Sequence, residues 1–198
     1  FKWFRDTFGE AEMEHEENSL GDAYELLANM AAKVPAGSDG LLMLPHLMGA
    51  YSPRPNSYAR GSFTGFTLTH TRGHFVRSLL EGVAFLLNNN LDVIARTGLK
   101  VTEIRSTGGG AKSALWNQIK ADVNNIPVIT LANDDTALIG DAILAGVASG
   151  MYPSIEDGCS SLVAIKNRIY PSDNVDIYKE AYQKYSSLDD TLDKYYKK

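Results

Sequence analysis

The chain has 198 residues, of which 44% are hydrophobic and 22% are charged, so it is long enough to bury a substantial core. A formal net charge of −5, without any long run of Lys or Arg, argues against a nucleic-acid-binding protein. Apolar runs reach only about five residues, far below the ~20 that span a membrane. The single Cys159 cannot form an internal disulfide, which favours a cytoplasmic location.

The chain opens with Phe-Lys-Trp-Phe, which has apolar bulk on two sides, as though it began inside a helix. We therefore expect a piece of a longer protein. Residues 20–33 have apolar side chains at helical intervals, and we expect Ser19 to cap this helix. The turn-forming stretch Val-Pro-Ala-Gly-Ser-Asp-Gly should end it.

The middle of the chain combines an apolar stretch, an irregular loop and a long helix. Residues 40–47 indicate a buried strand or apolar loop. Residues 48–62 are rich in turn formers, and long loops of this kind are often functional. Residues 71–97 carry an apolar stripe at helical spacing that Gly98 ends, which predicts the central helix of the domain.

The second half alternates between strands and helices. Its expected elements are a strand at 101–107, a helix at 112–125, a strand at 127–131, a helix at 136–150 and a tail helix from Asp173 whose tyrosines pack on the domain. The first three form a compact β-turn-α-β unit. We predict that residues 1–198 form a single α/β unit.

Three consecutive glycines, Gly108–Gly110, stand at the turn of that unit. The dinucleotide fingerprint fails because Ser113 stands where its third glycine should be, and the Walker motif fails because Ala111 stands where a glycine should precede the lysine. Two interpretations remain open. The N–H groups of the turn and helix could face an anionic ligand, or the glycines could serve a tight structural turn.

Four stretches, in the same order along the chain, resemble one family. Residues 108–122, GGGAKSALWNQIKAD, are similar to the adenosine-binding segment of the FGGY carbohydrate kinases, and residues 61–81, GSFTGFTLTHTRGHFVRSLLE, follow that family's C-terminal signature. LPHLMGAYSPRPNSYARG resembles a family loop in which many xylulose kinases have Glu-Arg instead of Ala50 and Tyr51. TALIGDAILAGVASGMY resembles the helix that connects the two domains, with Asp141 replacing a small residue.

The resemblance implies an RNase H-like fold of the actin, hexokinase and Hsp70 ATPase superfamily. The chain would be a helix-rich α/β C-terminal domain lacking its first strands, which should leave an open sheet edge and an apolar face that a homo-oligomer could cover. ATP or ADP with Mg²⁺ would be the cofactor of the full-length enzyme. D-xylulose is the first candidate substrate, gluconate, glycerol and ribulose are alternatives, and a noncatalytic nucleotide-binding module remains open. An oxidoreductase is disfavoured by the failed glycine fingerprint.

The same resemblance implies a nucleotide site at the glycine turn. The bare backbone of Gly109 and Gly110 would let a nucleotide approach closely, with N–H groups near its phosphates or ribose. The next helical turn would border the adenine. The residues expected to bind nucleotide are Gly108, Gly109, Gly110, Ala111, Ala114, Asn117 and, at the start of the chain, Lys2. No catalytic residue and no metal ligand is expected, because the family places the base and the metal aspartates in its N-terminal domain.

Four other features are predicted to be structural. His70 and His74 have metal-pair spacing without a third ligand, so we expect cap and surface residues. Glu81 lies one turn beyond Arg77, which predicts an ion pair rather than a catalytic acid. Trp116 should be a core residue. Asp134 and Asp135 should form a solvated turn that caps a helix.

Overall fold

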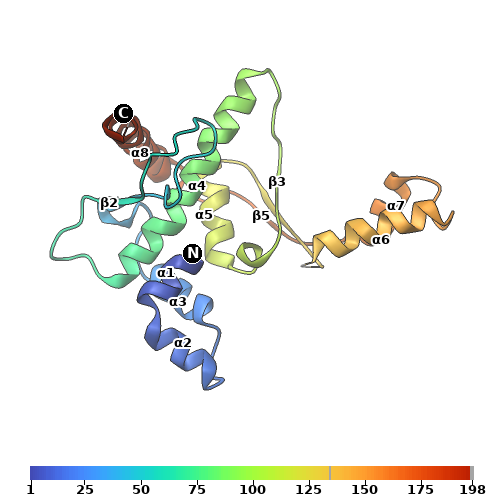
Figure 1. The fold of residues 1–198 in the computed structure, drawn as a ribbon, viewed down its shortest axis with the longest axis horizontal. Helices are drawn as coiled ribbons and strands as arrows, with labels where there is room; N and C mark the ends of the chain where they lie inside the picture. Colours follow the sequence, from blue (N-terminus) through green and yellow to red (C-terminus); the bar gives the residue numbers. More distant parts are fainter. Residues whose placement is uncertain (134, 197–198) are drawn as a thin grey trace.

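The computed structural model describes residues 1–133 and 135–196, so Asp134 lies outside the described residues. Two helices, α4 (Arg72–Arg96) and α5 (Ala114–Asn124), pack against each other at the centre. Figure 1 shows the N-terminal helices below this pair, a small sheet to its right and the C-terminal helix at the upper left. None of the described helices has the length and apolar content to cross a bilayer.

Three short helices begin the chain: α1 (Lys2–Phe8), α2 (Glu10–Glu17) and α3 (Ala23–Ala32). The α3 helix confirms most of the predicted 20–33 segment, but its cap was predicted wrongly. Asp22 caps it by accepting a hydrogen bond from the Glu25 N–H at 2.9 Å, whereas Ser19 has a φ of 59° in the preceding turn. An aspartate directly before the first apolar residue is the better acceptor for the free N–H groups.

The apolar segment 40–47 contains a three-residue strand, β1 (Leu42–Leu44), preceded by a short 3-10 turn at Ser38–Gly40. The strand pairs antiparallel with β2 (Ser62–Thr64), which hydrophobic spacing did not predict. Between them runs the expected irregular loop. The β1 strand lies against α4 so closely that a Cβ on Gly82 would meet the Met43 carbonyl oxygen at 2.2 Å.

The predicted central helix is confirmed as α4, and it supplies more of the buried core cluster than any other described element. Its fully buried side chains include Val76, Leu79, Leu80 and Phe85. They pack with apolar residues of α3, β1 and α5, so that the first and second halves of the chain share one core.

The β-turn-α-β unit is also confirmed. The strands β3 (Ile104–Ser106) and β4 (Val128–Leu131) are parallel, with α5 between them in sequence. A third strand, β5 (Ile165–Ile169), pairs antiparallel with β4 and was missed. The sheet order is β3-β4-β5, so β3 has a strand neighbour on one side only within the described chain.

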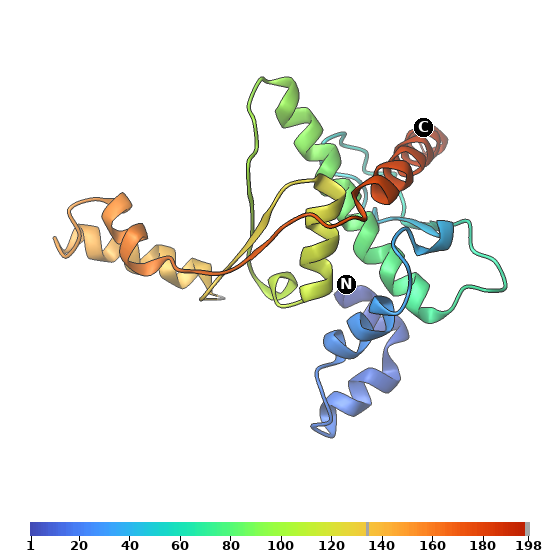
Figure 2. The same ribbon diagram turned by 180° about the vertical axis from the view of Figure 1, so that it is seen from behind.

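Two helices, α6 (Thr136–Ala148) and α7 (Ile155–Leu162), form an arm that extends away from the body in both views (Figures 1 and 2). The α7 helix was not predicted. Asp135 caps α6 by accepting from the Leu138 N–H at 3.2 Å, as expected. Apolar side chains exposed on this arm include Leu138, Leu144, Met151 and Ile155.

The tail forms the long helix α8 (Val175–Tyr196), as predicted. Its aromatic residues Tyr178 and Tyr185 are fully buried against Phe85, and Tyr182 is half-buried beside them. Tyr195 is 77% exposed, so the prediction that all the tail tyrosines pack on the domain is wrong at this residue.

Candidate functional site

The glycine turn joins the end of β3 to the start of α5. Gly108 has φ 71° and ψ −166°, a combination that is essentially confined to glycine. The next residues form one 3-10 turn, in which the N–H of Ala111 donates to the Gly108 carbonyl at 3.0 Å and that of Lys112 to the Gly109 carbonyl at 3.2 Å. The first glycine is therefore required by backbone conformation alone.

The N–H groups of Gly109 and Gly110 have no hydrogen-bond acceptor within the part of the chain that the structure describes. Both residues follow a strand and precede a helix whose N-terminus is capped by the Ser113 hydroxyl, which accepts from the Trp116 N–H at 3.2 Å. The turn thus presents free donors beside the positive end of the α5 dipole. Such an arrangement suits an anion.

The two central glycines differ in what surrounds them. A Cβ built on Gly110 would lie 3.0 Å from the Trp116 ring, so packing explains this glycine. A Cβ built on Gly109 meets nothing within 4 Å, and its φ is outside the left-handed region. Neither sterics nor backbone conformation within the described chain explains Gly109, which leaves space for a ligand against its backbone.

Asn117 supports the turn from below. It is buried, and its side-chain Nδ2 donates to the Ala111 carbonyl at 2.7 Å. Ala114 is exposed on the first turn of α5, next to the glycines. The structure thus brings together the predicted residues from Gly108 to Asn117; that they bind nucleotide stays a prediction.

Lys2 lies apart from that group, exposed on the first turn of α1. The preceding residue, Phe1, makes an edge contact with Trp116 at a centroid distance of 6.0 Å. The start of α1 is therefore beside the glycine turn, and a role for Lys2 in nucleotide binding stays a prediction. Trp116 packs against the core as expected, and its Nε1 donates to the Leu80 carbonyl at 3.0 Å.

One residue of this site was missed. Lys120 lies beneath the turn, where its Nζ donates to Ser106 Oγ at 2.9 Å and to Asn117 Oδ1 at 3.3 Å. Burial lowers the pKa of this ammonium to about 8. The sequence did contain a signal for it: Lys120 lies three residues after Asn117 and four after Trp116, so all three share one face of the helix.

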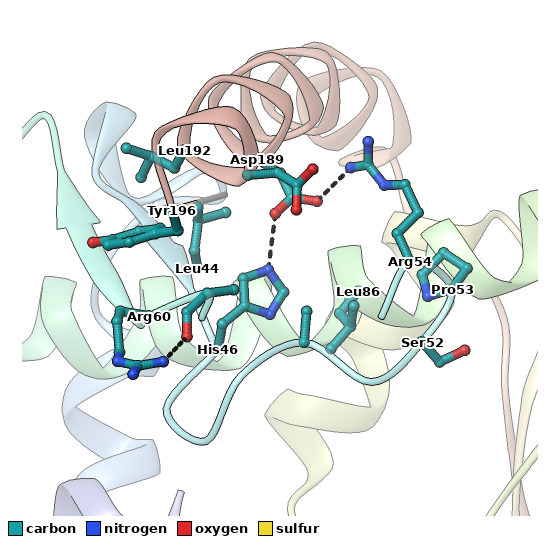
Figure 3. A pocket seen from close by; sticks show the side chains of 13 residues that line it. Leu44, His46, Ser52, Pro53, Arg54, Arg60, Leu86, Asp189, Leu192 and Tyr196 are labelled. Carbon is teal, nitrogen blue, oxygen red and sulfur yellow. Dashed lines mark hydrogen bonds and ion pairs between the residues drawn. The ribbon is translucent and has the colours of Figure 1, made fainter. Parts of the chain in front are cut away.

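A second cluster lies where the loop 46–60 meets α8. His46 is buried with its Nε2 2.8 Å from Asp189 Oδ1, and Arg54 approaches the other oxygen of the same carboxylate at 2.8 Å. Figure 3 shows the loop passing under α8 with these side chains directed at Asp189. The cavity among them is only about 10 Å³, room for no more than a water molecule. This cluster therefore attaches the loop to α8 and leaves no space for a ligand.

The Arg77–Glu81 ion pair is confirmed at 2.9 Å and is fully buried. Tyr178, Ser38 and the Gly37 N–H complete the hydrogen bonds of the Glu81 carboxylate. Burial raises the pKa of Glu81, and the Arg77 charge opposes that shift. With both oxygens occupied, this acid stabilises the fold and is not accessible to a substrate.

The two histidines of the metal-like spacing are cap and turn residues. His74 completes a capping box with Thr71 at the start of α4, and His70 Nδ1 accepts from the Thr67 N–H at 2.8 Å. No group of three or more metal-ligating side chains is present among the described residues.

Comparison with known proteins gives a family match over most of the chain. A family model described as the C-terminal domain of the FGGY family of carbohydrate kinases matches residues 1–149. A xylulose kinase from Staphylococcus epidermidis is 32% identical over 187 residues, which is 94% of this chain and 36% of that protein. A gluconokinase from Bacillus subtilis is 34% identical over 171 residues, 86% of this chain and 33% of that protein. The chain therefore spans about a third of the length of these relatives.

Solved structures give the same match. A ligand-bound xylulose kinase from Lactobacillus acidophilus superimposes with a TM-score of 0.84 at 25% identity, covering 98% of this chain and 38% of that one. A Plasmodium falciparum glycerol kinase, solved with ADP, gives a TM-score of 0.72 at 26% identity, covering 94% of this chain and 36% of that one. The whole arrangement of helices and strands is thus shared with a region of larger proteins.

Proposed function

The chain belongs to the FGGY family of carbohydrate kinases, and from this premise we propose that it is the nucleotide-binding half of an ATP-dependent sugar kinase. The predicted fold class is confirmed: this is a helix-rich α/β C-terminal domain of the actin- and hexokinase-like fold. The observation that carries the proposal is Gly109, whose open backbone has no explanation within the described chain.

In this proposal the glycine turn holds the phosphates or ribose of the nucleotide. The N–H groups of Gly109 and Gly110 donate to phosphate oxygens, where the α5 dipole adds a favourable potential. Ala111 and Ala114 border the adenine with apolar surface, and Asn117 keeps the turn in place through the Ala111 carbonyl. Lys2 approaches from the start of α1.

The turn offers no carboxylate for Mg²⁺. The nearest acid along α5, Asp122, is bonded to Ser172 through both carboxylate oxygens. We therefore assign no magnesium ligand to this segment, and propose that the metal, the catalytic base and most sugar contacts belong to the rest of the full-length enzyme. Transfer of the γ-phosphoryl group would then depend on closing the two halves around both substrates.

The proposed acceptor is D-xylulose, and the proposed location is the cytoplasm. Support comes from the xylulose kinases among the relatives. Gluconate, glycerol and ribulose remain alternatives, because a gluconokinase and a glycerol kinase match the same residues. A noncatalytic nucleotide-binding module of the same fold is the alternative from a different class.

The test is a coupled assay of the full-length protein. ATP consumption should depend on D-xylulose, with D-gluconate, glycerol and ribulose measured in parallel, and ADP binding should be followed by calorimetry. Turnover with another of these acceptors would transfer the assignment to that substrate. ADP binding without turnover on any of them would favour the noncatalytic module, and failure to bind ADP would refute the nucleotide site.

A further inference from the structure

Lys120 connects both sides of the glycine turn. Its Nζ reaches Ser106 Oγ, at the end of β3 where the turn begins, and Asn117 Oδ1, whose amide in turn holds the Ala111 carbonyl. The same ammonium lies 4.7 Å from the centroid of the Trp116 ring, against which Gly110 packs. One side chain therefore links the end of β3, where the turn begins, to the two α5 residues that contact the turn.

Among the described residues, no carboxylate pairs with this ammonium. Burial is what lowers its pKa, and no carboxylate of the described chain offsets that cost. Among the described acids, Asp122 bonds Ser172, Asp135 caps α6 and Glu103 pairs with Arg105. The turn itself carries Lys112, a cation, and the acid of α1, Asp6, pairs with Arg5 of the same helix.

Even a partly buried ammonium without a counter-ion costs free energy on folding. A neutral side chain of similar length, such as methionine, would fill the space over Trp116 without that cost. The charge is therefore better explained by a group that arrives after folding, and the free N–H groups immediately above indicate an anionic one.

We propose that Lys120 is a positioning residue for the nucleotide, fixing the glycine turn through Ser106 and Asn117 and supplying the positive charge that its phosphates require. The inference rests on the proposed function and adds the group that controls affinity at that site. Phosphate binding favours the charged ammonium, so nucleotide affinity falls as pH rises through the pKa of Lys120 in the free protein, about 8.

The experiment measures the Kd for ADP in the full-length kinase between pH 7 and pH 9.5. For the wild type, affinity should fall about tenfold across this range, which the phosphates cannot cause because they are fully ionised above about pH 7.5. Lys120→Met should bind about tenfold more weakly at pH 7 and show no pH dependence. Lys120→Arg, whose charge persists throughout, should bind within about threefold of the wild type at pH 7 and remain flat to pH 9.5.

Thermal unfolding distinguishes this role from a purely structural one. Lys120→Met should melt at or above the wild-type temperature at pH 7, because it removes a charge that folding disfavours. Wild-type protein that binds ADP with the same affinity at pH 7 and 9.5 would overturn the inference, whatever the variants do. So would Lys120→Met with wild-type affinity. Failure of the wild type to bind ADP at all would instead refute the proposed nucleotide site.

Discussion

Replacing Gly109 by valine tests whether the glycine turn faces a ligand. In the described structure a Cβ at this position meets nothing within 4 Å, and the backbone φ lies outside the left-handed region. Folding should therefore accept the side chain. Loss of glycine freedom in the unfolded state stabilises by ~0.4–1 kcal/mol, and the β-branched side chain offsets part of that, so we expect a free energy of unfolding within about 1 kcal/mol of the wild type.

The bound state should respond very differently. A nucleotide that lies against the bare backbone of Gly109 must move away by the thickness of the new side chain, which takes its phosphates beyond hydrogen-bond distance of the two free N–H groups. Each charge-assisted hydrogen bond contributes ~1.5 kcal/mol or more, so losing two costs about 3 kcal/mol. The Kd for ADP should rise on the order of 100-fold.

The assay is calorimetry with ADP on the full-length protein, together with the KM for ATP and a urea unfolding curve. Gly110→Ala would be a less informative variant. Its Cβ would press on the Trp116 ring at 3.0 Å, and overpacking of this kind costs ~1–3 kcal/mol of stability, so weaker binding there would not separate ligand from packing. If Gly109→Val leaves both the Kd for ADP and the KM for ATP unchanged, the ligand interpretation of the turn is refuted.

Three further predictions concern the isolated chain, the buried Arg77–Glu81 pair and the Asp189 cluster. Residues 1–198 alone should show no D-xylulose-dependent ATP consumption and should bind ADP with a Kd at or above ~1 mM in calorimetry, because the proposed function assigns the catalytic base and the other side of the cleft to the rest of the full-length enzyme; turnover by this segment would place the catalytic base within it. Glu81→Ala should lower the free energy of unfolding by ~3–5 kcal/mol in urea, since it leaves Arg77 buried without its anion; Glu81→Gln should lose less, and equal stability of the alanine variant would contradict the network. Asp189→Ala should leave His46 without its carboxylate partner and Arg54 with Asp190 alone, and should cost ~2 kcal/mol, seen as faster amide exchange in residues 46–60 with α5 unchanged; unaltered exchange in that loop would show that the His46–Asp189–Arg54 cluster does not hold it.

Much of the fold could be predicted from the sequence where the cause is local. The apolar stripe of α4 repeats every three to four residues over 25 residues, a period that only a helix places on one face. Helical spacing also located α5 and α8, a run of small residues located α6, and the glycine run marked the turn. The short strands β2 and β5 were not predicted. The β2 strand has only three residues, and β5 is exposed along most of its length with little alternation of apolar and polar side chains. Each is defined by pairing with a strand that is distant in the chain.

The candidate site likewise combines features that local sequence predicts with features that only tertiary contacts determine. Sequence alone identified a bare backbone turn at Gly108–Gly110 and the residues that follow it, because a glycine run and a helix start are both local signals. Only the tertiary structure showed why each glycine is present: Gly108 for its backbone conformation, Gly110 because the Trp116 ring leaves no room for a side chain, and Gly109 beside open space. Only it placed the Lys120 ammonium under the turn, against Ser106 of another element. Local propensity depends on neighbours in the chain, whereas burial, unmet charge and free space depend on neighbours that folding brings together.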